Sequence, residues 1–313
     1  MSSSATRAAD VSEAPPVHDG RARKPIHRGE KWAALVLLIP ALVGFGMFWV
    51  LPSIRGIWYS LTNFNLLSEP TFIGLDNFRE LAADPVARTS LLVTVQFVVF
   101  SVVIGTVLAL ITAALMQRLR LKVWVRSILL LPWLVPNVAI ALIWAWLLDG
   151  NLGYLNRAMR SVGLSGVSFY NEAHAMPIII AIGIWSGLGY TALILFAGMT
   201  QVPTEMYEAG GIDGASESRM FFSITLPLIR PVIALVIVMS AIGSFQVFDL
   251  VMIGYGGNPI PSVRVIFFYI YQQSFAFFRM GYGSAIALAL AIVLAALTMI
   301  QMRVMRANRS DLS

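Results

Sequence analysis

The chain has 313 residues, of which 58% are hydrophobic and only 12% are charged, and its formal net charge is +6. Soluble domains carry about 25% charged residues, so this composition excludes an ordinary soluble protein and indicates a membrane-embedded one. The sequence contains no cysteine, which excludes a disulfide framework and a thiolate metal site.

Six apolar stretches are long enough to cross a bilayer as helices, because a span needs about 20 residues. The first follows a long charged leader with no cleavage-type segment, which predicts an uncleaved helix rather than a signal peptide. We therefore predict an all-α polytopic membrane domain over 32–308, between cytoplasmic tails at 1–31 and 309–313, with 1–31 disordered. The predicted spans lie near 32–51, 91–115, 128–148, 176–199, 232–253 and 282–302.

The distribution of lysine and arginine predicts the orientation of these spans. Fifteen of the 22 basic residues fall in the N-terminal tail, the 116–127 loop, the 200–230 loop and the C-terminus. We therefore expect both termini on the cytoplasmic side of the cell membrane, as six spans require. A seventh span over 265–278 would break this pattern. That stretch is also too short and is interrupted by glutamines, which favours an interfacial or re-entrant segment.

Three loops are expected on the outer face, at 53–90, 149–175 and 254–281. In the first loop, Asp76 is expected to cap a short helix that runs through Leu81, because its carboxylate can accept from the free amides of the first turn. The other two loops contain glycine-rich turns, at 149–153 and 256–259.

The 200–230 loop is polar and acidic, and it lies between two apolar spans. Pro203 and Thr204 are expected to start a short helix that Gly210 and Gly211 end. Asp213 or Ser216 then caps a second short helix, which runs through Arg219 towards Ile224, and Pro227 and Pro231 separate it from the next span. The prediction is an elbow of two short helices in the cytoplasm. A plain cytoplasmic turn is the simpler interpretation, but a turn does not require four acidic residues.

The residues of this loop resemble those of ABC importer permeases. The family motif is Glu-Ala-Ala, three residues, Gly, nine residues, Ile, one residue and Leu-Pro. The chain has Glu208-Ala209-Gly210, Gly214, Ile224 and Leu226-Pro227 at that spacing, with only the second alanine changed. Further matches, such as Phe248-Asp249-Leu250 and Gly256-Gly257-Asn258-Pro259, extend the likeness over nearly all of 32–308. They resemble the first membrane subunit of the maltose-type sugar permease family.

This resemblance implies a type I ABC importer permease fold in which the elbow sits in a groove of a cytoplasmic ATPase subunit. Glu208 would anchor the elbow by charged hydrogen bonds, while Gly214 and Ala215 allow close backbone approach. The implied coupling residues are Glu208, Ala209, Gly210, Asp213, Gly214, Ala215, Ile224, Leu226 and Pro227.

The implied partners are a second permease subunit, two ATPase subunits and an extracytoplasmic substrate-binding protein that delivers ligand through the 53–90 and 254–281 loops. The chain has no Gly-x-x-x-x-Gly-Lys-Ser/Thr motif, so ATP would be bound by a partner and this subunit would catalyse no reaction. We expect no resident cofactor, no metal and no nucleic-acid partner. A heterodimer is favoured, and a homodimer stays open. The implied substrate is a mono- or oligosaccharide, with polyols, sugar phosphates and other small polar solutes also open.

Polar residues in the fourth and fifth predicted spans indicate a substrate pathway. Asp249 is the only ionisable residue within a span, where a charge costs about 2.5–3.5 kcal/mol at the centre. Helical spacing would align Ser240 with Ser244 and place Gln246 beside Asp249. The resemblance adds Trp185 and Tyr190 of the fourth span, which would cover the face of a sugar. The competing interpretation is that serines and aromatic residues only pack helices or sit at interfaces, and that Asp249 pairs with an arginine.

Two other function classes have weaker support in the residues. An intramembrane hydrolase needs a buried nucleophile with histidine or paired aspartates, but His18, His27 and His174 all lie outside the spans. An ion-coupled secondary transporter that uses Asp249 is the alternative, although such a transporter favours several intramembrane carboxylates or matched broken helices.

Overall fold

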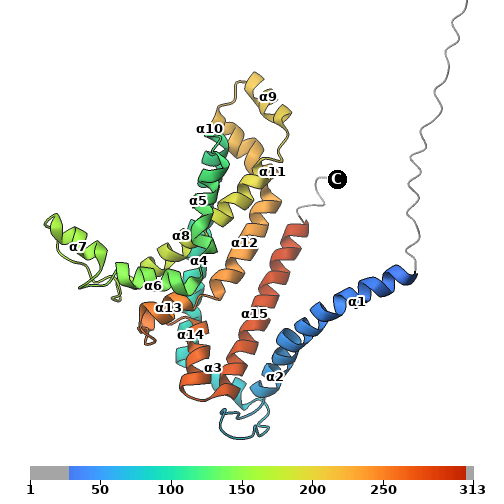
Figure 1. The fold of residues 1–313 in the computed structure, drawn as a ribbon, viewed down its shortest axis with the longest axis vertical. Coiled ribbons are helices and arrows are strands. Elements are labelled where there is room, and N and C mark those ends of the chain that lie inside the picture. Colours follow the sequence, from blue (N-terminus) through green and yellow to red (C-terminus); the bar gives the residue numbers. More distant parts are fainter. Residues whose placement is uncertain (1–27, 308–313) are drawn as a thin grey trace, which may run out of the picture. The chain divides into compact units, whose positions relative to one another are not determined.

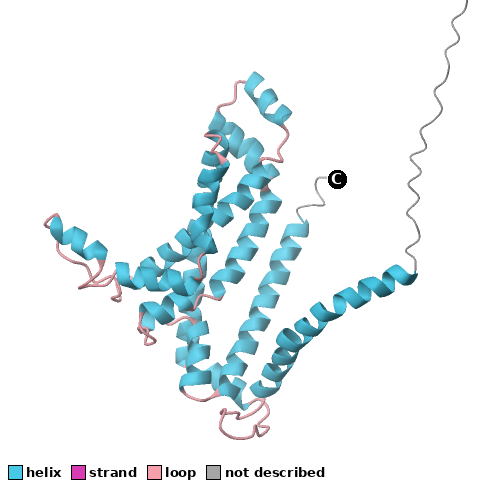
Figure 2. Cartoon of the chain, in the orientation of Figure 1, coloured by secondary structure: helices cyan, strands magenta, loops and turns pink. Residues whose placement is uncertain are grey.

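The computed structural model describes residues 28–307, and this part of the chain is almost entirely helical (Figure 2). Its β-structure is one isolated antiparallel bridge between Thr62 and Phe72. The predicted all-α class is therefore confirmed. The helices are α1 (Arg28–Phe45), α2 (Leu51–Ser60), α3 (Asp76–Ala83), α4 (Pro85–Arg118), α5 (Val123–Leu134), α6 (Asn137–Leu147), α7 (Tyr154–Ser161), α8 (Ala175–Met199), α9 (Thr204–Ile212), α10 (Glu217–Met220), α11 (Leu226–Leu228), α12 (Arg230–Phe245), α13 (Asp249–Gly254), α14 (Ile266–Tyr271) and α15 (Met280–Ala307).

The chain divides into two compact units, 1–53 and 54–313. The first unit contains α1, which continues through a π-helical turn, Gly46–Val50, into α2. The apolar segment that could cross a membrane here is Val36–Ser60, so the helix extends beyond the end predicted at 51. The predicted disordered tail also ends earlier, because α1 starts at Arg28. Residues 1–27, which carry the rest of that prediction, lie outside the described part.

Three long helices occupy the positions of the second, fourth and sixth predicted spans. They are α4, α8 and α15, and each is apolar and long enough to cross a bilayer. Helix α4 starts six residues before the predicted span. There, Asp84 accepts from the amides of Val86 and Ala87 at 2.8 and 3.2 Å, and Pro85 occupies the first turn.

The third predicted span is not one continuous helix. Helices α5 and α6 meet at an angle of 89°, and Val135 and Pro136 form the break. Pro136 lacks an amide hydrogen, and the residue before a proline is biased away from helical geometry, which accounts for the position of the bend.

The fifth predicted span is also interrupted, because α12 ends at Phe245 instead of reaching 253. The chain leaves helical geometry between Gln246 and Phe248 and restarts as the short helix α13. No proline marks this break. The ring of Phe248 instead packs beside the rings of Phe268 and Tyr271, with centroids 6.4 and 5.3 Å away. At its other end α12 follows a 70° bend after α11.

Helix α4 lies at the centre of the second unit and packs against α8, α12 and α14 (Figure 1). Helix α5 packs along α8, and α15 packs against α3, α12 and α14. Small residues allow the close approach of α4 and α8, because Ala109, Ala113 and Ala192 are completely buried in one apolar cluster. This cluster lies near the α9 end of the helices, and two further clusters lie nearer α3 and α13.

The 265–278 segment is not a span in the structure, in agreement with the prediction. It forms α14 and a π-helical turn, Gln272–Ala276, and it packs into the protein core. Ile266, Phe268 and Tyr269 are buried, and the Ile266 amide donates to the Thr94 hydroxyl at 2.8 Å.

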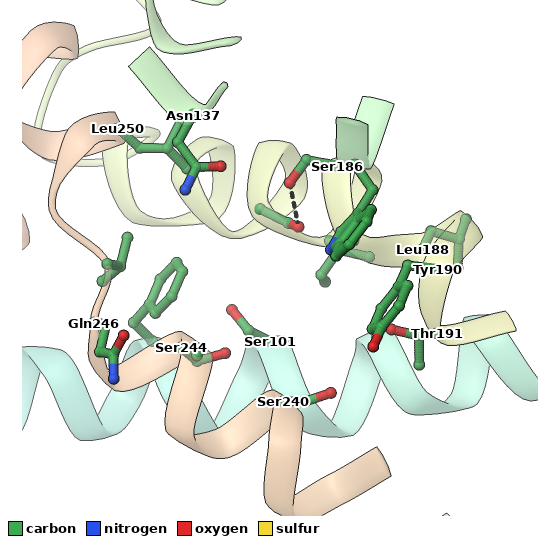
Figure 3. Close-up of a pocket in the computed structure, with 18 of the residues that line it drawn as sticks. Ser101, Asn137, Ser186, Leu188, Tyr190, Thr191, Ser240, Ser244, Gln246 and Leu250 are labelled. Carbon is green, nitrogen blue, oxygen red and sulfur yellow. Dashed lines mark hydrogen bonds between the residues drawn. The ribbon is translucent and has the colours of Figure 1, made fainter. Parts of the chain in front are cut away.

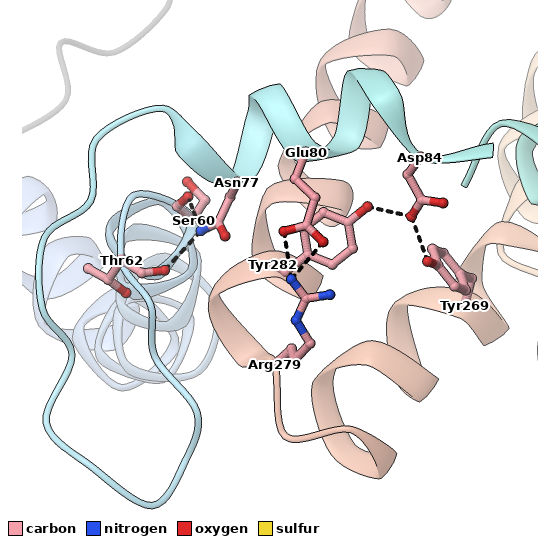
Figure 4. A network of polar contacts seen from close by, with 8 residues as sticks. All are labelled: Ser60, Thr62, Asn77, Glu80, Asp84, Tyr269, Arg279 and Tyr282. Carbon is pink, nitrogen blue, oxygen red and sulfur yellow. Dashed lines mark hydrogen bonds and ion pairs between the residues drawn. The ribbon is translucent and has the colours of Figure 1, made fainter. Parts of the chain in front are cut away.

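Polar side chains tie α3 to the segments around it (Figure 4). The buried Asn77 amide donates to the carbonyls of Ser60 and Thr62 at 2.9 and 2.8 Å. Both carboxylate oxygens of Glu80 accept from Nη2 of Arg279, at 2.7 and 2.6 Å. Helix α3 begins at Asp76, as predicted, but this residue does not cap it. Its carboxylate lies in the first turn and accepts from Arg79 instead.

Asp84 connects three elements at the same end of the unit (Figure 4). Besides capping α4, its carboxylate accepts from the hydroxyls of Tyr269 and Tyr282 at 2.6 and 2.5 Å. Burial acts to raise the pKa of the Asp84 carboxyl, but these hydrogen bonds and those from the α4 amides together hold that pKa below its ordinary value. Asp84 is therefore a charged anchor for α14 and α15.

Candidate functional site

The 200–230 loop folds into an elbow that comprises α9, α10, the π-helical turn Phe221–Thr225 and α11. Helix α9 starts after Pro203, as predicted, but it runs through Gly210 and Gly211 and ends at Ile212. The turn falls at Gly214, whose φ of 72° lies in the left-handed region that glycine tolerates. Beyond it, the Ala215 amide donates to the Gly210 carbonyl at 2.9 Å.

The second arm of the elbow begins at Ser216. Its hydroxyl accepts from the Arg219 amide at 3.3 Å and caps α10, whereas Asp213 lies at the C-terminal end of α9. Of the two predicted caps, Ser216 is therefore the one that the structure uses. The chain then continues into α11, which contains Leu226 and Pro227.

Contacts between the two arms hold the inner side of the elbow together. A Cβ atom added at Gly210 would lie 3.2 Å from the side chains of Ile224 and Met220, so the two arms pack closely at this glycine. The Tyr207 hydroxyl and the buried Thr225 hydroxyl form a 2.8 Å hydrogen bond between the arms. The half-buried residues of the motif that belong to this inner side are Gly210, Ala215, Ile224, Leu226 and Pro227.

The outer side of the elbow is exposed and acidic. Glu208, Ala209, Asp213 and Gly214 all face solvent, and Ile212 beside them is 88% exposed. Glu217 forms a 3.0 Å ion pair with Arg118, which ties α10 to the end of α4. The motif therefore separates into an inner group that shapes the elbow and an outer group that is free to contact another molecule.

A second candidate site is a cavity of about 320 Å³ bordered by α4, α5, α6, α8, α12 and α13 (Figure 3). Both helix breaks reach it, because Asn137 of α6 and Gln246 after α12 are among its lining residues. The rings of Trp133 and Tyr190 stack in one wall, with centroids 4.3 Å apart and planes inclined by 6°. The size falls within the range of about 300–1,000 Å³ that is usual for small-molecule sites.

Five of the six predicted pathway residues line this cavity. They are Tyr190, Ser240, Ser244, Gln246 and Asp249. The sequence predicts Gln246 and Asp249 on one strip of a single helix. The structure does not place them so, because helical geometry is interrupted between these two residues. Asp249 is the first residue of α13 and does not lie inside a long span.

Trp185 is not among the residues that line this cavity. Its ring packs edge to face on Trp144, with centroids 5.5 Å apart, and it borders a separate apolar groove between α4 and α8. Trp185 and Tyr190 lie five residues apart, which turns them to different sides of α8 at about 100° per residue.

Sequence reasoning missed other polar and aromatic residues of the cavity wall, among them Ser101 and Thr106 of α4, Trp133 of α5 and Asn137 of α6. A signal existed for Asn137, because it is a polar residue after a proline within an apolar stretch. Ser101 and Thr106 carried a weaker signal, since hydroxyl residues are common in membrane helices.

Comparison with protein families supports the family suggested by the elbow. The family described as "Binding-protein-dependent transport system inner membrane component" matches residues 101–311. The chain is 31% identical over 283 residues to the probable ABC transporter permease protein YurN of Bacillus subtilis, covering 88% of this chain and 97% of that protein.

Two other relatives have more specific names. The chain is 31% identical to the sulfoquinovosyl glycerol transport system permease protein SmoG of Agrobacterium fabrum, covering 89% of this chain and 92% of that protein. It is 30% identical to the sn-glycerol-3-phosphate transport system permease protein UgpA of Yersinia pestis, covering 87% of this chain and 93% of that protein.

Solved structures agree in fold. A chain of a bacterial ABC transporter involved in the import of the acidic polysaccharide alginate superposes with a TM-score of 0.78 at 22% identity, covering 89% of this chain and 96% of that chain. The same kind of transporter, in complex with an alginate pentasaccharide-bound periplasmic protein, gives a TM-score of 0.71. The predicted importer permease fold and the predicted family are both confirmed.

Proposed function

Because the chain belongs to the family of inner membrane components of binding-protein-dependent transport systems, we propose that it forms half of the translocation pathway of an ATP-driven sugar importer. The observation that carries the proposal is the elbow, in which Glu208, Gly214 and Leu226-Pro227 keep the family spacing. Its outer face offers exposed carboxylates and the apolar Ile212 to a partner surface. That partner is a cytoplasmic ATPase, since this chain has no ATP-binding motif of its own.

The proposed assembly contains a second, different permease subunit, two ATPase subunits and an extracytoplasmic binding protein. Both termini and the elbow face the cytoplasm, as the concentration of Lys and Arg in these parts predicts. Closure of the ATPase pair on ATP moves the two elbows together. The helices then rock between inward-facing and outward-facing states, and the cavity is exposed to each side in turn. This subunit holds no cofactor and catalyses no reaction itself.

Family membership argues against the ion-coupled alternative built on Asp249. The broken helices α5–α6 and α12–α13 are a feature that secondary transporters also use. Here they border a cavity that contains a single carboxylate. An ion-coupled mechanism would also leave the elbow without a role.

The test is co-purification of the full chain, expressed with the proteins encoded beside it, in wild-type and Glu208→Ala forms. We expect an ATPase and a second permease to accompany the wild type, and the ATPase to be lost or strongly depleted with Glu208→Ala. Glu69→Ala is the matched control, because Glu69 is an exposed carboxylate in the 53–90 loop. Purification of the chain without any ATPase, or equal recovery of the ATPase with Glu208→Ala, would contradict the proposal.

A further inference from the structure

Helix α7 and the residue that follows it carry an apolar stripe that the described residues leave largely uncovered. Leu155, Ala158, Met159 and Val162 have the i, i+3, i+4, i+7 spacing that aligns side chains on one face of a helix. Val162 is 72% exposed and Leu155 is 40% exposed, while Ala158 is also exposed and Met159 is half-buried. Figure 1 shows α7 projecting away from the other helices of the second unit.

The polar groups of the same loop are paired within the loop. Asn156 is completely buried, and its amide nitrogen donates to the carbonyls of Asp149 and Val167 at 3.1 and 2.9 Å. The Asn156 side-chain oxygen accepts from the Val167 amide at 2.7 Å. The Asp149 carboxylate accepts from the amides of Asn151 and Leu152 at 2.9 and 2.7 Å. A buried, paired polar side chain beside an exposed apolar stripe is the reverse of the usual arrangement in water, which indicates that the stripe meets an apolar medium.

The loop around the stripe is basic. Residues 150–171 contain Arg157 and Arg160 but no aspartate or glutamate. Nη2 of Arg160 donates to the Gly150 carbonyl at 2.8 Å, whereas Arg157 is exposed and forms no ion pair with any described residue. Arginine on the polar side of a short amphipathic helix is typical of helices that lie in the headgroup region of a membrane, where the guanidinium can contact lipid phosphate.

The apolar stripe also continues an apolar surface on α6. Helix α7 packs against α6, on which Leu142, Ile143 and Trp146 are exposed. Because α6 belongs to the third predicted span, we expect this surface to face lipid. Trp146 and Tyr154 are exposed before and after the connection between the two helices, and these residue types gather where a membrane meets water. The charge, the aromatic residues and the continuity with α6 all favour lipid as the occupant of the stripe.

We propose that α7 is an interfacial anchor, which lies along the outer surface of the bilayer with Leu155 and Val162 against the acyl chains and Arg157 on an anionic phospholipid headgroup. A soluble partner that binds and leaves would return the stripe to water at each departure, whereas lipid covers it continuously. The anchor fixes the outer end of α6, a helix that borders the cavity. The proposal goes beyond the importer function, because it requires only that the chain is embedded in a membrane.

The test is a fluorescence measurement on the purified complex of the full chain with its co-purified partners in lipid nanodiscs. The chain has no cysteine, so Val162→Cys provides one attachment site for an environment-sensitive label, and the complex with the unsubstituted chain corrects for labelling of the partners. A nitroxide near the top of a phosphatidylcholine acyl chain quenches a label that touches lipid. Ser161→Cys is the matched control, because Ser161 is exposed on the polar side of α7. We expect quenching of Val162→Cys to be at least about threefold stronger than quenching of Ser161→Cys.

Nanodiscs of phosphatidylcholine, with and without phosphatidylglycerol, test the role of Arg157. The acidic lipid should increase the quenching of Val162→Cys, because an anionic surface attracts nearby arginine. Addition of Arg157→Gln should abolish this increase. Addition of Arg88→Gln should preserve it, because Arg88 is an exposed arginine in another predicted outer loop and forms no ion pair among the described residues.

Equal quenching of Val162→Cys and Ser161→Cys by the lipid nitroxide overturns the anchor. So does protection of Val162→Cys from both the lipid nitroxide and aqueous iodide, which would assign the stripe to the second permease, or protection only when the binding protein is added, which would assign it to that partner. An increase with phosphatidylglycerol that survives Arg157→Gln overturns the headgroup contact. These outcomes are distinct from failure of the importer proposal, which is decided by whether the ATPase co-purifies.

Discussion

At the scale of single residues, the contact between α5 and α8 depends on one glycine. A Cβ atom added at Gly189 would lie 1.8 Å from the Leu129 carbonyl oxygen, so no other residue fits without displacement of the α5 backbone. Two residues earlier, Gly187 has no heavy atom within 4 Å of the same added atom. Sequence inspection treats the two glycines alike, because both flank the aromatic residues of one predicted span.

We expect Gly189→Ala to destabilise the protein strongly and Gly187→Ala to have little effect on stability. Overpacking in a core usually costs about 1–3 kcal/mol, and a clash with backbone belongs at the upper end of that range or above it. Thermal unfolding of the detergent-solubilised chain, followed by size-exclusion chromatography, measures the difference. Equal transition temperatures for the two variants would show that α5 does not approach α8 at Gly189 as described.

At the scale of elements, the sequence predicted helices well and their interruptions poorly. Composition and length are sufficient to find a span, because the bilayer imposes both. The α5–α6 bend has a local cause in Pro136, yet prolines are tolerated in many straight membrane helices, so Pro132 and Pro136 alone did not decide it. The break after Phe245 depends on Phe248 packing against α14, which is distant in sequence and therefore invisible in a local pattern.

The elbow shows the same division between local and distant information. Its helices, its cap at Ser216 and its exposed acidic side follow from local residue types. The exact turn at Gly214 was missed because Gly210 and Gly211 offer the same local signal. What distinguishes Gly210 is its contact with Ile224 and Met220 of the other arm, which only the folded elbow reveals.

The hydrogen bond between Tyr207 and Thr225 should control how rigidly the elbow is held. We expect Tyr207→Phe to weaken the elbow by about 1–3 kcal/mol, because it leaves the buried Thr225 hydroxyl unpaired. Hydrogen exchange of the segment 204–228, measured by mass spectrometry, should accelerate while exchange in α4 stays unchanged. The control is Tyr154→Phe, because the Tyr154 side chain is 64% exposed. Identical exchange of 204–228 in the wild type and in Tyr207→Phe would contradict this account.

At the scale of the whole molecule, the predicted orientation in the membrane rests on the distribution of charge. The elbow and the 116–127 loop lie at the same end of the second unit, because Arg118 pairs with Glu217. The α3 network lies at the other end of α4, which spans Pro85–Arg118 (Figure 1). Most Lys and Arg residues fall on the elbow side of the predicted spans, which predicts that this end faces the cytoplasm.

The absence of cysteine from the sequence makes this orientation directly measurable. We expect Glu69→Cys to react with a membrane-impermeant maleimide in intact cells, and Ser218→Cys to react only after the membrane is permeabilised. Both positions are exposed, so accessibility of the side chain itself does not limit either reaction. Labelling of Ser218→Cys in intact cells would reverse the assigned orientation, and the unsubstituted chain provides the zero-label control.

The 89° bend between α5 and α6 also has a consequence for hydration. The ends of a helix leave backbone amide and carbonyl groups without partners in that helix, and hydrocarbon cannot satisfy them. This break and the one after Phe245 both open onto the same cavity. The cavity must therefore be wet when no solute occupies it.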